Sequence, residues 1–279
     1  MSHCDDVGRA TAPGRPILAL MSTASDRARP DAGLGRLALA RRAAALGGTR
    51  DAVVLTSRVP ALPPAVAAAV AEEWGLAIGR GASGFDAFAV PSFRLLAARP
   101  RAQQVLRAVS RRTNLVLPGS RAVVAGEGAL ATTLARTLST LGAHAILAAA
   151  PRGARLRAHL DGLETADAED VPGIAADYVL LTGEGQPPAD PARLRGVVAD
   201  ASYDGSGLAA AAFGEPARPG VRRLAGGPAL VVDIPAPLPA DLPDADGLAW
   251  GLVDLVVATA LLVRGDHDVD ARLAELAVA

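Results

Sequence analysis

The chain has 279 residues, of which 51% are hydrophobic and only 3% are aromatic, and its formal net charge is -1. A charge so close to zero creates no global field that would attract nucleic acid or an anionic membrane, so neither partner is expected. All 28 residues counted as lysine or arginine are arginines. Any mechanism that needs a lysine amine, as a base or as a Schiff-base former, is therefore excluded.

The features that bear on cellular location favour a soluble, cytoplasmic protein. Cys4 is the single cysteine, so a disulfide within the chain is excluded. The opening residues MSHCDDVGRATAPGR contain no apolar run after a basic segment, so no signal peptide is expected. The most apolar stretch, residues 248–263, is short for a membrane span and contains Asp254.

After a flexible start at residues 1–14, residues 15–114 are expected to form a small α/β lobe. Short apolar runs alternate with segments of helical spacing, and such alternation is typical of parallel strand pairing. The expected strands cover residues 15–21, 51–58 and 76–79, with a further candidate at 85–92. The expected helices cover residues 34–48, which end in a glycine pair, and 63–75, which have proline in the first turn.

A second alternation predicts a Rossmann-type, doubly wound parallel sheet over residues 115–243. Expected strands are 121–126, 144–149, 176–183, 196–202 and 228–235, and expected helices are 128–141 and 153–161. The proline-rich residues 236–243 form a loop. Two closing helices, 245–263 and 268–277, make up a C-terminal segment, 244–279, that packs back on the first lobe or on a partner.

The sequence AVVAGEGALA, residues 122–131, places a glycine turn directly between an expected strand and an expected helix. In the pattern Gly126-x-Gly128-x-x-Ala131, the first glycine permits a tight turn and the second lets the backbone approach a diphosphate. The diphosphate would bind free amides at the helix N-terminus. The residues expected to line it are Gly126, Glu127, Gly128, Ala129 and Leu130. The pattern favours dinucleotide binding, and a purely structural turn is the alternative.

The acidic residue that usually binds the adenosine ribose is missing. Its expected place, at the end of the next strand, is Ala149. A charged acceptor contributes roughly 1.5 to 3 kcal/mol per hydrogen bond, so its absence weakens NAD binding. Arg152 and Arg155 follow closely, and arginine at this place accommodates a 2′-phosphate. NADP is therefore an option beside NAD, with Arg152 next to the ribose, unless both arginines are merely solvated.

A longer stretch, residues 111–165, contains several short motifs in a fixed order. They are Arg111–Asn114, Gly119-Ser120, Gly126–Ala131, Gly142-Ala143, Arg155–Ala158 and Asp161–Leu163. In this order and spacing the stretch resembles the cofactor domain of S-adenosyl-L-homocysteine hydrolases. The resemblance implies an NAD-binding domain that follows a substrate lobe, which is shorter here than in the family.

The same resemblance implies that the hydrolase chemistry is lost. The positions of the family's catalytic lysine, aspartate and asparagine correspond to Ser92, Leu96 and Ala97, and its ribose-binding glutamate corresponds to Ala149. The turn at residues 199–204 lacks the family's histidine. Hydrolysis of adenosylhomocysteine is therefore not expected. The resemblance instead implies a divergent family member that keeps a nucleotide pocket.

Few polar residues remain as candidates for chemistry. Tyr203 and Asp204 follow an expected strand beside the nicotinamide position, although an ordinary turn would use the same residues. Thr182 and Gly183 are expected on the nicotinamide side. The spacing of cysteine and histidine is not that of a metal site, so no metal is expected.

Two functional hypotheses follow. The first is a pseudoenzyme that binds a nucleotide or small molecule and acts as a binding or partner protein, as a homodimer or with another protein, in specialised metabolism. The second is an NAD(P)-dependent oxidoreductase that acts on an unidentified small molecule, with Tyr203 or Asp204 in proton transfer.

Overall fold

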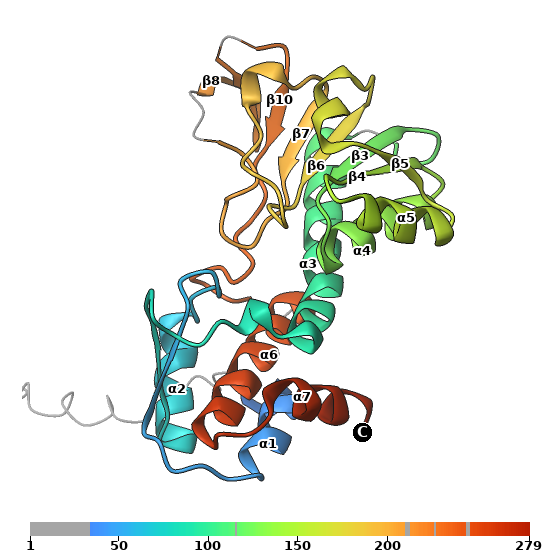
Figure 1. The fold of residues 1–279 in the computed structure, drawn as a ribbon. Helices are drawn as coiled ribbons and strands as arrows, with labels where there is room; N and C mark the ends of the chain where they lie inside the picture. The colour runs from blue at the N-terminus through green and yellow to red at the C-terminus, as the bar shows by residue number, and fades with distance from the viewer. Residues whose placement is uncertain (1–33, 115, 210–212, 226, 244–245) are drawn as a thin grey trace, which may run out of the picture. The chain divides into compact units, whose positions relative to one another are not determined.

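The computed structural model describes residues 34–114, 116–209, 213–225, 227–243 and 246–279 (Figure 1), which belong to one compact unit. The flexible start expected at residues 1–14 and the strand expected at 15–21 lie outside the described residues.

Within the described residues, an eight-stranded sheet has the order β5-β4-β3-β6-β7-β10-β9-β8. The six strands from β5 to β10 in this order pair in parallel. Their bounds are β3 Arg121–Ala125, β4 His144–Ala148, β5 Glu164–Ala166, β6 Tyr178–Leu181, β7 Val197–Asp200 and β10 Leu230–Val232. The predicted Rossmann-type sheet is confirmed. The chain steps from β3 to β5 in one direction and from β6 to β10 in the other, so the carboxyl ends of β3 and β6 flank a topological switch point.

The central parallel strands β3, β4, β6 and β7 are largely apolar because both faces of the sheet are covered. Val124, Leu147 and Leu180 face a core that is shared with α3 (Pro91–Thr113) and α4 (Ala129–Thr140). Their neighbours along the strands face a second core, which Val171 of the 3-10 turn Ala168–Gly173 and Leu194, directly after the 3-10 turn Pro191–Arg193, help to cover. A further helix, α5 (Arg152–Leu160), lies between β4 and β5 in the chain.

The antiparallel edge of the sheet was not expected from the sequence. β8 (Phe213–Arg218) and β9 (Val221–Leu224) form a hairpin that adds to β10. Every residue of β8 is exposed. Its sequence, FGEPAR, therefore has none of the apolar alternation that marks a half-buried strand.

The first part of the chain forms a smaller layer around a two-stranded parallel sheet. Its elements are a 3-10 turn at Leu34–Arg36, α1 Ala38–Ala44, β1 Ala52–Leu55, α2 Pro64–Trp74, β2 Ala77–Arg80 and a 3-10 turn at Ala87–Ala89. The strand expected at residues 85–92 is wrong. The Asp86 side chain accepts a hydrogen bond from Phe88 N and closes the 3-10 turn, and Pro91 then begins α3, where its fixed φ suits the first helical turn.

The two closing helices, α6 (Gly247–Arg264) and α7 (Val269–Val278), share a core with this first part. α6 contacts α1 and α3. By length and composition alone α6 is apolar enough to cross a membrane, but 67% of that window is buried inside the fold. Its apolar residues are therefore used as core.

Carboxylates from distant parts of the chain cap α1 and α3. The N-cap residues Leu37 and Val90 offer no side-chain acceptor. Asp254 of α6 instead accepts from Leu39 N at 2.9 Å and Ala40 N at 2.7 Å. Asp270 of α7 accepts from Ser92 N at 2.8 Å. The first turns of both helices thus depend on the C-terminal helices for their hydrogen bonds.

α3 connects the core of the first part, which contains Phe93, with the sheet core that α3 shares with α4, which contains Val105. Between them, Arg101 is only 2% exposed. Its guanidinium donates to the carbonyls of Ala201, Ser202 and Pro235 at 3.0, 2.7 and 2.8 Å. Burial lowers the pKa of Arg101 to about 10, so the side chain is charged at neutral pH and ties the ends of β7 and β10 to α3.

The substitution Arg101→Ala is expected to lower the free energy of unfolding by about 3 kcal/mol, because buried carbonyls lose a charged donor. Arg107→Ala, on an exposed position of the same helix, should change it by less than about 0.5 kcal/mol. Urea denaturation with comparable m values measures both. Equal losses of stability in the two variants would contradict the role of Arg101 in tying β7 and β10 to α3.

Candidate functional site

A cavity of about 390 Å³ lies at the carboxyl ends of β3 and β6. Its wall brings together most of the residues that the sequence singled out: Glu127, Gly128, Thr182, Gly183, Tyr203 and Asp204. Arg58, Phe88 and Arg94, from the first part of the chain, complete the wall and were not predicted. The cavity therefore lies where ligands bind in open α/β sheets.

The glycine turn has the close packing that its sequence predicts. Gly126 has a φ of +149°, in the region that favours glycine, and its amide donates to Ala148 O at 2.9 Å. A Cβ atom at Gly126 would overlap the hydroxyl of Thr182, which itself donates to Ala125 O at 2.9 Å. The turn thus joins β3, β4 and the end of β6 without room for a side chain.

The amides expected to bind a diphosphate hold a carboxylate of the chain itself. Leu130 N donates to Glu184 Oε1 at 3.2 Å, and Ala131 N donates to Glu184 Oε2 at 2.9 Å. The N-cap residue of α4, Gly128, has no side chain to do this, and a Cβ atom there would overlap the Glu184 carboxylate. Glu184 was not predicted as a site residue, although its position in the sequence Thr-Gly-Glu-Gly directly after β6 was a usable signal.

Opposing electrostatic effects act on Glu184, and their net result is a raised pKa. Burial raises the pKa of Glu184, while hydrogen bonds from Ala131 and Leu130 and the charges of Arg94 and Arg58 act in the opposite direction. Burial is the largest of these effects. The helix N-terminus and the two arginines therefore make this end of the cavity suited to an anion.

Tyr203 lines the same cavity and has a buried hydroxyl. Its ring packs on Phe88, with centroids 4.6 Å apart. In the part of the chain that the structure describes, the hydroxyl has no hydrogen-bond partner. Burial and the charge of Glu184 raise the pKa of Tyr203, so the phenol stays protonated at neutral pH and can donate a hydrogen bond.

The second predicted catalytic candidate, Asp204, is exposed and accepts from Ser206 N at 3.1 Å. This bond closes a turn, which is the alternative that its sequence left open. Tyr203 and Asp204, the two predicted catalytic candidates, nevertheless both line the cavity.

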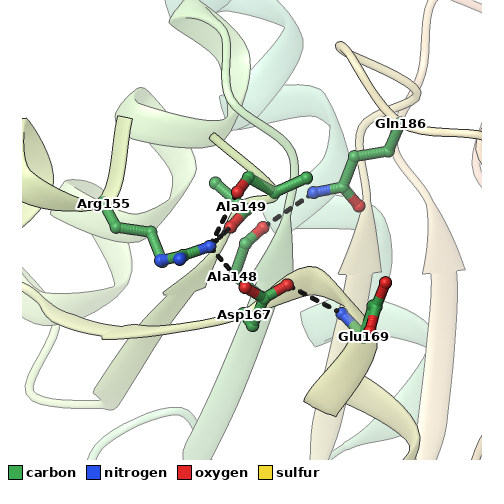
Figure 2. A network of polar contacts seen from close by, with 7 residues as sticks. Ala148, Ala149, Arg155, Asp167, Glu169 and Gln186 are labelled. Atoms are coloured by element: carbon green, nitrogen blue, oxygen red, sulfur yellow. Dashed lines mark hydrogen bonds and ion pairs between the residues drawn. The ribbon is translucent and has the colours of Figure 1, made fainter. Parts of the chain in front are cut away.

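Figure 2 shows the region beyond β4, where the adenosine ribose was expected. Arg155 donates to the carbonyls of Ala149 and Ala150 at 2.6 and 2.8 Å and pairs with Asp167 at 2.7 Å. Asp167 also accepts from Glu169 N at 3.3 Å. Arg155 is thus committed to joining the end of β4 to the end of β5.

The other residues of the sequence prediction occupy different places around the turn. Ala129 and Leu130 form the first turn of α4, where the Leu130 side chain is buried and only its amide serves the site. Arg152 begins α5, is exposed and does not line the cavity. Arg157, one turn later, lines it instead.

Comparison with known proteins identifies no family for this chain. No protein-family model matches the sequence, and no curated protein matches it significantly. Among solved structures, a dipicolinate synthase chain from Bacillus halodurans is similar, with 16% identity over 75% of this chain and 66% of that chain and a TM-score of 0.45. Transhydrogenase from Sinorhizobium meliloti has 16% identity over 80% and 70% of the two chains, with a TM-score of 0.46. The protein described as L-alanine dehydrogenase has 15% identity over 62% and 53%, with a TM-score of 0.43. The chain spans just under two thirds of the length of the dipicolinate synthase chain.

The predicted membership of the S-adenosyl-L-homocysteine hydrolases is wrong. Neither a family model nor a curated hydrolase matches the chain, and the similar solved structures bear other names. The motifs of residues 111–165 coincide with β3, the glycine turn, α4, β4 and α5. A strand, glycine turn and helix of this kind serve any Rossmann-type sheet, so their order alone does not identify a family.

Replacing Glu184 with glutamine is expected to alter how stability depends on pH. Burial raises the pKa of Glu184 in the folded state, so a protonated Glu184 favours the folded state. This contribution to stability is fully present below about pH 4.3 and is lost as the pH rises through the folded-state pKa. Glu184→Gln stays neutral throughout. The free energy of unfolding of the parent should therefore fall relative to that of Glu184→Gln as the pH rises above about 4.3, as measured by urea denaturation at a series of pH values. A constant difference over that range would show that Glu184 titrates as it does in the unfolded chain.

Proposed function

We propose that this protein binds a nicotinamide dinucleotide at the carboxyl ends of β3 and β6, and that it is an NAD(P)-dependent oxidoreductase for a small molecule bound in the cavity. The observation that carries the proposal is the pair of amides, Leu130 N and Ala131 N, which already hold a carboxylate. This donor set suits an anionic oxygen, and it follows a glycine turn at the switch point of the sheet.

The dinucleotide would be held by residues from three segments. Gly126, Glu127, Gly128, Ala129 and Leu130 would contact the diphosphate, Thr182 and Gly183 would face the nicotinamide side, and Arg152 would reach the adenosine ribose. The region after β4 supports recognition of a phosphate better than recognition of hydroxyls. Ala149 offers no carboxylate there, and Asp167 is paired with Arg155.

The nicotinamide ring would supply or accept a hydride at the carbon of the substrate that is reduced or oxidised. The chain's own contribution is the accompanying proton. The Tyr203 hydroxyl, which is buried and protonated, would donate that proton to the substrate oxygen, so that a carbonyl gains one hydride at carbon and one proton at oxygen. The rings of Phe88 and Tyr203 pack against each other in the wall of this part of the cavity.

Arg152→Ala should weaken NADP binding by about tenfold, since one charge-assisted hydrogen-bond site is removed, and leave NAD binding unchanged. Isothermal titration calorimetry with the two oxidised nucleotides measures both constants. Arg195→Ala, at another exposed arginine, serves as the control for loss of charge alone. If the parent protein binds neither nucleotide, the proposed function is wrong, and if both affinities fall equally, Arg152 does not read the 2′-phosphate.

Tyr203→Phe tests the proposed proton donor. The hydroxyl has no partner in the described structure, so its removal should leave thermal stability unchanged or raise it. The same change should reduce the rate of reduction of an accepted substrate by about 10²-fold or more without altering nucleotide affinity. NADH and NADPH oxidation with a panel of small 2-oxo acids, ketones and aldehydes provides the assay. Loss of nucleotide binding or of folding in Tyr203→Phe would assign the tyrosine a structural role.

A further inference from the structure

We propose that Glu184 is an internal competitor for the dinucleotide: its carboxylate must leave the amides of α4 before the diphosphate can bind. The inference rests on the proposed nucleotide site and assigns the residue that sets its affinity.

The competition is direct because carboxylate and diphosphate need the same atoms and the same space. Both oxygens of Glu184 are bound, Oε1 by Leu130 N at 3.2 Å and Oε2 by Ala131 N at 2.9 Å. The carboxylate also fills the space above Gly128, where a Cβ atom would overlap it. A ligand backbone can approach that glycine only after the carboxylate has moved.

The glycines on either side of Glu184 allow this segment to change conformation. Gly183 and Gly185 flank it with φ angles of +68° and +67°, a region that glycine enters and leaves without steric cost. The main chain of the segment is attached by the bond from Glu127 N to Glu184 O at 3.2 Å. Arg58 and Arg94 line the same cavity, and their charges favour ionised Glu184, so a displaced carboxylate has cationic partners nearby.

Tyr203 provides an independent indication that the cavity takes a ligand. Tyr203 lines the same cavity, and its buried hydroxyl has no hydrogen-bond partner among the described residues, Glu184 included. A buried hydroxyl without a hydrogen bond is rare in native proteins and calls for a ligand or water. While Glu184 binds the amides of α4, those amides have an acceptor, but the Tyr203 hydroxyl has no partner.

Asp254 is the matched control for a purely structural cap. It binds Leu39 N and Ala40 N at the start of α1 in the same way as Glu184 binds the start of α4, but it is not part of the cavity wall. A change at Asp254 removes a distant helix cap of the same kind and leaves the nucleotide site intact.

The test compares the affinities of the full chain and of Glu184→Gln, Glu184→Ala and Asp254→Asn for NAD and NADP by calorimetry. Removal of a cap-strength competitor should tighten binding of the preferred nucleotide by roughly three- to thirtyfold in Glu184→Ala, with Glu184→Gln between it and the parent. The thermal midpoint of Glu184→Ala should fall without nucleotide and should rise more than that of the parent when nucleotide is added. Asp254→Asn should lose stability and keep the parent's affinity.

Each result decides the proposal. Tighter binding in the Glu184 variants alone supports it. Equal or weaker binding in those variants overturns it while the proposed function stands. Tighter binding in Asp254→Asn as well would trace the effect to general loosening of the fold and also overturn it. An absence of nucleotide binding in every protein, with all of them folded, overturns both the inference and the proposed function.

Discussion

Carboxylates that reach helix N-termini from far along the chain organise this structure. Among the described helices, α1, α3 and α4 have the N-cap residues Leu37, Val90 and Gly128, none of which forms a side-chain hydrogen bond to its own helix. Asp254, Asp270 and Glu184 bind the free amides instead. Each bond joins a helix start to an element distant in sequence, so local helix formation and tertiary packing depend on one another.

The three caps differ in what surrounds them. Asp254 and Asp270 join α1 and α3 to the C-terminal helices and contribute to the fold. Glu184 lies at the switch point of the parallel sheet, in a cavity wall with Arg58, Arg94 and the buried hydroxyl of Tyr203. Amides that hold one anion can hold another, and for this reason the cap on α4 has a bearing on ligand binding that the other two lack.

The region after β4 shows how a committed side chain limits the possible ligands. An arginine near the ribose position is expected to read a phosphate, yet Arg155 binds two carbonyls and Asp167 (Figure 2). It joins two strand ends, leaving the exposed Arg152 as the candidate for a 2′-phosphate. Sequence position alone did not separate these two arginines, because the difference lies in the carboxylate that β5 brings to one of them.

Local patterns predicted the elements whose residues face a core. β3, β4, β6 and β7 consist mainly of apolar residues, and the glycine turn before α4 needs Gly126 because Thr182 packs against it. The exposed β8 has no such pattern and was missed, and residues 85–92 were mistaken for a strand because an Asp86 cap and Pro91 outweigh their apolar content. The family assignment failed for a related reason, since motifs generic to a nucleotide-binding sheet were interpreted as specific to one family.

The sequence by itself determined the parallel sheet, the close packing at the glycine turn and the exclusion of lysine chemistry, because burial, backbone geometry and residue type act locally. Only the tertiary structure decided which group occupies the amides of α4, which arginine stays exposed, and that Tyr203 is buried without a partner. These outcomes depend on side chains that meet across long stretches of chain, and no local pattern records where such side chains will meet.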